Sequence, residues 1–164
     1  MRSSAVSGTA FLDRGHDHAH CLEDALDRAA TVCRSRGARL TPLRRRVLEL
    51  VWSGHKPLGA YEILDVLKGE RGGAAPPTVY RALDFLRRQG LVHRIESRNS
   101  FIGCPEPEAP HAVQFLICSD CGLAAELSDK GIDDAIRKGA AKAGFAVGRR
   151  TVEIEGVCPN CRRD

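Results

Sequence analysis

The sequence has few aromatic residues and no long hydrophobic run. Aromatic side chains make up 5% of the 164 residues, which is too few for a platform on which RNA bases could stack. No segment approaches the ~20 consecutive apolar residues that a membrane-spanning helix needs, and residues 1–20 lack the apolar core of a secretory signal. We therefore expect a cytoplasmic protein with no membrane partner, and not an RNA-binding module.

Two further absences concern chemistry. There is no secretory signal, and the seven cysteines are an odd number, so a disulfide framework is not expected in a reducing cytosol. Metal binding or redox chemistry is then the default expectation for clustered thiols. No H-E-x-x-H motif or other catalytic constellation is present, and we expect neither an enzyme nor a small-molecule substrate.

Charge is present but unevenly distributed along the chain, whose formal net charge is +4. Residues 1–104 carry 17 Lys and Arg against 11 Asp and Glu, whereas residues 105–164 carry 8 against 10. A basic first part suggests a polyanionic partner, most commonly nucleic acid. The alternative is a basic face that is merely solvated.

Apolar periodicity and capping residues predict four helices in the first part. Residues 1–20 show no periodicity and are interpreted as a mobile arm that carries histidines. Thr41 as N-cap and Pro42 at the first helical position mark the start of the second helix. The predicted helices cover residues 22–37, 41–54, 59–70 and 77–90.

The predicted fold class is α+β with two domains. Two β-prone runs around a polar turn near Arg98 and Asn99 indicate a hairpin, and helices followed by such a wing predict a winged helix-turn-helix over residues 21–103. The Pro-rich residues 104–110 are interpreted as a hinge. Residues 111–164 are predicted to form a small α+β domain with an antiparallel sheet. Its expected elements are strands over 112–117 and 123–127, a helix over 130–144 and a strand over 145–157.

Two C-x-x-C pairs carry the strongest chemical signal. Cys118 and Cys121 form one pair, Cys158 and Cys161 the other, with 36 residues between them. Four thiolates are the ligand set of a closed, tetrahedral structural zinc site. A redox pair is the weaker alternative, because neither pair opens the helix of a βαβ unit. A third alternative is that the four cysteines are free thiols without a common function.

Four further candidate ligands gather around the hinge: His93, Cys104, His111 and Glu126. Nitrogen, sulfur and oxygen donors together suit zinc. Each residue also has an ordinary interpretation, as a strand, core, loop or surface residue, so spacing alone leaves their joint coordination open. A zinc hydrolase could use the same set, but catalytic zinc keeps a position open for water, and four protein ligands would close it.

The segment "PPTVYRALDFLRRQGLVHRIESRNSFIGC", followed by "HAVQFLICSDCG" and a terminal C-x-x-C, resembles the ferric uptake regulator (Fur) family and, within it, the zinc uptake regulator (Zur) branch. The resemblance runs from about Leu22 to Cys161. It implies a DNA-binding domain, a hinge and a dimerisation domain. It further implies a homodimer that binds a palindromic operator in double-stranded DNA and represses zinc uptake genes when zinc is bound.

The resemblance also assigns two zinc ions per subunit, one structural and one regulatory. The structural ligands would be Cys118, Cys121, Cys158 and Cys161, and the regulatory ligands His93, Cys104, His111 and Glu126. Iron-sensing members have a His- and Asp-rich run before the first C-x-x-C, whereas this chain has "HAVQFLIC". With a cysteine at position 104, this favours zinc over the alternative, an iron- or peroxide-responsive regulator.

The fourth helix is the candidate for DNA recognition. It begins with Thr78, Tyr80 and Arg81, and Arg81 could form a bidentate contact with guanine. The family resemblance adds Tyr61, although both tyrosines could simply pack at the surface. A basic belt would neutralise phosphates; it consists of Arg34, Arg36, Arg39, Arg44, Arg45 and Arg46.

The remaining candidate ligands are His16, His18, His20 and Cys21. They could form an auxiliary metal site or belong to a weakly binding tail. Cys33 lies on the apolar face of the first predicted helix and is expected in the core.

Overall fold

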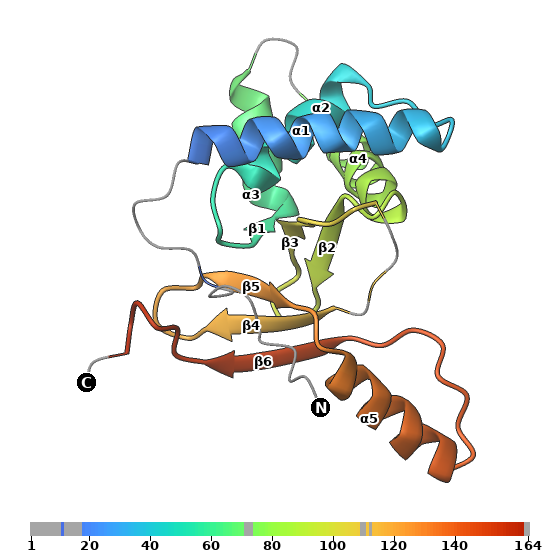
Figure 1. The fold of residues 1–164 in the computed structure, drawn as a ribbon. Coiled ribbons are helices and arrows are strands. Elements are labelled where there is room, and N and C mark those ends of the chain that lie inside the picture. Colours follow the sequence, from blue (N-terminus) through green and yellow to red (C-terminus); the bar gives the residue numbers. More distant parts are fainter. Residues whose placement is uncertain (1–10, 12–17, 71–73, 109–110, 112, 163–164) are drawn as a thin grey trace.

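The computed structural model describes residues 11, 18–70, 74–108, 111 and 113–162 (Figure 1). Within them the chain forms five helices and six strands. They are α1 His18–Ser35, α2 Pro42–Trp52, β1 Leu58–Gly59, α3 Ala60–Gly69, α4 Pro76–Arg88, β2 Val92–Ile95, β3 Ser100–Gly103, β4 Gln114–Cys118, β5 Ala124–Leu127, α5 Lys130–Lys142 and β6 Val152–Gly156. None of the helices in these residues is long and apolar enough to cross a membrane.

The helices begin and end close to the predicted positions. The Thr41 side chain accepts a hydrogen bond from Arg44 N at 3.4 Å and Pro42 opens α2, which confirms the predicted N-cap. α1 begins at His18, four residues before the predicted start at Leu22. Gly90, after α4, has a φ of 68°, a conformation that glycine adopts without strain.

Residues 18–103 form what we call the winged module. β2 and β3 pair as the predicted antiparallel hairpin, with Asn99 in the turn at a φ of 47°. β1, which was not predicted, adds a two-residue strand to the other edge of β3. The four helices cover this sheet (Figure 1) and enclose an apolar core that includes Cys33, as expected. The predicted winged helix-turn-helix is confirmed.

Residues 113–162 form the C-terminal module, a sheet of order β5-β4-β6 with one helix. β4 and β5 are antiparallel, but β4 and β6 are parallel, so the prediction of an antiparallel sheet was wrong for this pair. The physical reason is that the chain reverses direction twice after β4, once in the turn to β5 and again through α5 and the long connection to β6, so β6 runs in the same direction as β4. The last strand starts at Val152 instead of 145. α5 extends beyond the end of the sheet (Figure 1) and has no buried residue.

The two modules meet along the wing. Ile95 and Ile102 of the hairpin pack in one cluster with Phe115, Ile117 and Ala124 of the C-terminal sheet. In Figure 1 the wing strands β2 and β3 lie between the helices and strands β4 and β5. The wing is therefore sandwiched between its own helical core and the second module.

The described part of the predicted hinge is attached to the winged module. Cys104 N donates to Leu91 O at 3.0 Å, and the Arg28 guanidinium donates to Pro105 O at 2.7 Å. Pro107 is buried. Residues 104–108 are therefore bound to the winged module, although their proline-rich composition is typical of a linker.

Candidate metal centres and DNA-binding surface

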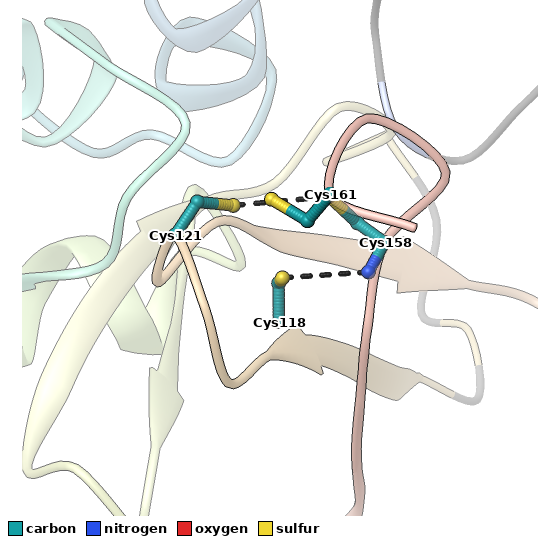
Figure 2. Close-up of side chains that lie close together, drawn as sticks. All are labelled: Cys118, Cys121, Cys158 and Cys161. Carbon is teal, nitrogen blue, oxygen red and sulfur yellow. Dashed lines mark hydrogen bonds between the residues drawn. The ribbon is translucent and has the colours of Figure 1, made fainter. Parts of the chain in front are cut away.

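Four cysteine side chains converge at one edge of the C-terminal sheet (Figure 2). Cys118 ends β4, Cys121 lies in the following turn, and Cys158 and Cys161 lie in the turn after β6. Their sulfur atoms all lie within 4.8 Å of one another, and Cys121 Sγ is 3.8 Å from Cys158 Sγ. Because β4 and β6 run parallel, the turns that follow them leave the sheet at the same edge. The structure thus brings together the four predicted thiols.

The electrostatics of this cluster call for a cation. Backbone N–H groups of Cys121 and Cys158 lower the pKa of the Cys118 thiol to about 6, and Cys158 N is 3.3 Å from Cys118 Sγ. Hydrogen bonding with the sulfurs of Cys158 and Cys121 raises the pKa of Cys161 to about 12. Four adjacent thiolates repel one another, and a zinc ion is the usual partner of such a set.

The second predicted set also converges, and it spans both modules. His93 lies on β2, Cys104 follows β3, His111 precedes β4 and Glu126 lies on β5. Their ligand atoms all lie within 4.8 Å of one another. Glu126 is central: its Oε1 is 2.5 Å from His111 Nε2 and its Oε2 is 3.4 Å from His93 Nε2. Cys104 Sγ lies 3.8 Å from His111 Nε2.

Two atoms of this mixed cluster are buried but not hydrogen-bonded. Among the described residues, His93 Nε2 and Glu126 Oε2 have no hydrogen-bond partner, and they face each other only in an ion-pair contact of 3.4 Å. Burial raises the pKa of Glu126, but the neighbouring His93 and His111 outweigh it and hold that pKa below its usual range. Burial, and then the charge of Glu126, raise the pKa of the Cys104 thiol to about 12. These donors fit a zinc ion, which would bind both of these atoms and replace the thiol proton.

The residues predicted to read DNA bases lie on exposed faces of α3 and α4. Tyr61 is 69% exposed and Tyr80 45%. Burial, and then the charge and hydrogen bonding of the Tyr61 hydroxyl, raise the pKa of Tyr80, so the two side chains interact. Arg81 is exposed and forms no ion pair with any described residue, while Thr78 is half-buried at the start of α4. These side chains are accessible to a partner.

The arginines predicted to contact phosphates are engaged within the protein. Arg45 and Arg46 contact Glu49 at 3.3 and 3.0 Å, and the Arg44 guanidinium lies 3.6 Å above the Phe85 ring. Exposed ion pairs are weak and exchange readily for another anion. The role of Arg44, Arg45 and Arg46 at phosphates therefore stays a prediction.

Comparison with known proteins identifies the family. The sequence matches the Ferric uptake regulator family over residues 35–155. The chain belongs to the ferric uptake regulator family. It is 41% identical over 140 residues to the zinc uptake regulation protein of Escherichia coli (strain K12), covering 85% of this chain and 82% of that protein.

Solved structures agree with this Fur-family fold. A zinc uptake regulator complexed with zinc and DNA matches with a TM-score of 0.80 at 40% identity, covering 85% of this chain and 94% of that one. Holo XcZur matches with a TM-score of 0.77 at 42% identity, covering 84% and 96%. Apo XcZur matches with a TM-score of only 0.52 at 41% identity, covering 87% of this chain and 98% of that one. At nearly equal identity, the present chain is thus arranged more like the holo structure.

Sequence reasoning missed two residues that join parts of this Fur-family chain. Arg36, predicted in the phosphate belt, instead donates to the carbonyls of Gln89 at 2.5 Å and Pro107 at 2.9 Å. A guanidinium used in this way has fewer donors left for phosphate. Glu153 accepts hydrogen bonds from the wing turn, which contains Ser97. No local pattern identifies either residue, because their partners lie more than fifty positions away.

The auxiliary site predicted in the N-terminal arm is largely untested. His16 and the side chain of His18 lie outside the described residues. His20, in the first turn of α1, is 3.5 Å from Asp24 and exposed. Cys21 is half-buried. A metal site here stays a prediction.

Proposed function

We propose that this chain is a zinc-responsive, DNA-binding transcriptional repressor of zinc uptake genes. The observation that carries this proposal is the mixed cluster of His93, Cys104, His111 and Glu126, which draws its ligands from both modules. The relatives that are zinc uptake regulation proteins support it. So does the likeness to a zinc uptake regulator bound to zinc and DNA. The cytoplasm, where bacterial DNA lies, is the proposed site of action.

Two zinc ions per subunit are proposed. The four cysteines would hold a structural ion and the mixed cluster a regulatory one. When bound, zinc would supply positive charge and tie the ligands of one cluster together. With four protein ligands the regulatory site leaves no position open for water, which supports a regulatory role over a catalytic one.

The ligands of the mixed cluster would set the orientation of α4. His93 lies on β2, and both Val92 of that strand and Leu91 just before it belong to the same buried core as α4. Fixing His93 against Glu126 therefore fixes the recognition helix relative to the C-terminal sheet. Ligand binding that favours one arrangement shifts a pre-existing equilibrium toward it. The greater likeness to holo than to apo XcZur supports assigning the present arrangement to the closed form.

A homodimer and a palindromic operator are part of the proposal. α5 has no buried residue, and Phe145, Ile154 and Val157 are exposed apolar side chains of the C-terminal module. A second copy of this module would cover them. A symmetric dimer would present two α4 helices to two half-sites, which is the geometry of palindromic recognition.

The proposed domain division is a DNA-binding domain over residues 21–103, a hinge over 104–110 and a dimerisation domain over 111–164, with residues 1–20 as an arm. The contacts of residues 104–108 with the helical core support the proposal that these residues move together with the DNA-binding domain.

The function is tested by a gel shift with an AT-rich palindromic operator, titrated with buffered Zn(II), Fe(II) and Mn(II). Zinc alone should induce binding at physiological concentrations. Cys104→Ser should keep one zinc per chain and raise the zinc concentration needed by at least about 100-fold, since it removes a metal ligand. Cys33→Ala, which removes a thiol from the apolar core outside both clusters, is the control. A response to iron and not to zinc would overturn the proposal in favour of the iron- or peroxide-responsive alternative.

A further inference from the structure

The tip of the wing is held by a carboxylate of the C-terminal sheet. Glu153 lies on β6, and its two oxygens accept hydrogen bonds from the backbone N–H groups of Glu96 at 2.6 Å and Ser97 at 3.1 Å. These N–H groups belong to the turn between β2 and β3, where a strand partner no longer accepts them. Hydrogen bonds to an ionised carboxylate are shorter and stronger than neutral ones.

The other polar contacts at this place are weaker. Arg149 forms an ion pair with Glu96, and Arg98 Nη2 lies 3.9 Å from Glu155 Oε1. The Arg149 and Glu155 side chains are largely exposed, and exposed ion pairs contribute little because water screens them. Glu153 is therefore the polar residue that ties the wing tip to β6.

The Glu153 contact and the mixed metal cluster lie at opposite ends of the same strand. His93 and Ile95 are two positions apart on β2, so their side chains lie on one face. The His93 ring is 5.6 Å from the Phe115 ring, and Ile95 packs in the cluster that contains Phe115. Beyond Ile95 comes the turn that Glu153 holds. β2 thus contacts the C-terminal sheet through a metal ligand, an apolar cluster and a carboxylate, in that order.

We propose that Glu153 is a positioning residue of the zinc switch: its two hydrogen bonds form in the closed arrangement and lower the zinc concentration at which that arrangement is reached. This inference rests on the function proposed above. A contact made only in the binding-competent arrangement raises the competent fraction, and the apparent Kd for the ion falls in proportion. For two charge-assisted hydrogen bonds at a partly exposed site, the change is about tenfold.

The test compares the full-length chain with its Glu153→Gln variant, both already loaded with zinc at the four cysteines. Zinc is titrated while the fluorescence of Trp52 is recorded. Trp52 is the only tryptophan and lines cavities that Cys104 and Glu126 also line. The midpoint for the second zinc equivalent should rise about tenfold. Zinc stoichiometry and DNA affinity at saturating zinc should stay at wild-type values, which a merely structural role would not produce.

Two further variants make the test specific. Glu155→Gln removes the same charge from the same strand at an exposed position, and should shift the zinc midpoint by less than about twofold. Ser97→Pro removes one N–H donor to Glu153 at a turn position that proline fits, and should shift the midpoint about threefold. Combined with Glu153→Gln, its effect should be smaller than in the wild-type chain, because both act on one contact.

The outcomes separate this inference from the function on which it rests. Unchanged zinc midpoints in Glu153→Gln and Ser97→Pro would overturn the inference while leaving zinc-dependent DNA binding intact. Wild-type protein that binds the operator equally with and without zinc would overturn the proposed function. In that case, the Trp52 titration would still decide whether Glu153 affects zinc binding.

Discussion

The winged module buries twenty residues in one apolar core, whereas the C-terminal sheet contributes Phe115, Ile117 and Ala124 to a small cluster that it shares with the wing. Burying a large apolar side chain contributes about 1.5–3 kcal/mol. Phe115 and Ile117 are the two large side chains among these three, and they offset little of the entropy lost by ordering a module of about 50 residues. The winged module can therefore be stable by packing alone, and the C-terminal module depends on crosslinks and partners.

Breaking the four-cysteine cluster should have the largest effect and should be confined to one module. Structural zinc sites contribute about 10–16 kcal/mol to folding, so Cys118→Ser should unfold the C-terminal module and leave the winged module folded. Limited proteolysis with mass spectrometry and zinc analysis would measure this. Cys33→Ala, which removes a thiol outside both clusters, is the control, and a protease-resistant C-terminal module in Cys118→Ser would contradict the comparison.

A substitution at the edge of the winged module should show how tightly its core is packed. A Cβ atom at Gly103 would lie 2.1 Å from Trp52 Cε2, and overpacking of this kind costs about 1–3 kcal/mol. Gly103→Ala should therefore lower the thermal midpoint of the winged module. At Gly69 a Cβ would meet nothing within 4 Å, so Gly69→Ala is the matched control. Equal stability of both variants would show that Trp52 moves freely.

Within the winged module, DNA binding should divide into base and phosphate contacts. Arg81→Ala should lose about 1–3 kcal/mol of discrimination between the operator and random DNA. Arg45→Ala should weaken binding to both DNAs equally and reduce the salt dependence by about one phosphate contact at most. Fluorescence anisotropy at several salt concentrations would measure both. If both variants lost equal affinity for the operator and for random DNA, the division into base contacts and phosphate contacts would be wrong.

The smallest effect is expected from pH at the contact between the modules. Burial raises the pKa of Glu153, but hydrogen bonds from Ser97 and Glu96 outweigh it, so the pKa lies below the ordinary value of 4.5. A lowered pKa means that the contact contributes fully above the ordinary pKa and is lost as pH falls through the lowered one. The difference in denaturation midpoint between wild type and Glu153→Gln should be constant from pH 7 to about 5 and shrink below that. A difference in denaturation midpoint that grows as the pH falls would contradict this prediction.

Local signals in the sequence predicted the elements well. Thr41 and Pro42 define the start of α2, and the polar turn at Asn99 defines the wing, because caps and turns depend on neighbouring residues. The two ligand sets were also predicted, the cysteines from their spacing and the mixed set from the family resemblance. The structure adds that each set has its ligand atoms in one place.

What the sequence did not show depends on distant partners. The parallel pairing of β4 with β6 follows from the path of the chain through α5, which strand patterns do not encode. Arg36 looked like one of several similar arginines, yet it binds carbonyls of the linker. Glu153 sits in an ordinary alternating strand, and only the packing of two modules gives it a role. The roles of Arg36 and Glu153 can be recognised only from the tertiary structure.

The parallel pairing of β4 and β6 also has a consequence for synthesis on the ribosome. A chain made from its N-terminus completes the winged module before β4 emerges, and domains generally fold as units in that order. After Cys118 and Cys121 have been synthesised, 36 further residues must be added before the second pair, Cys158 and Cys161, is made. The nascent chain therefore passes through a stage in which the winged module can be folded while only two of the four cysteines exist. If these cysteines bind zinc as proposed, the zinc supply at that stage would decide whether the C-terminal module can complete its folding.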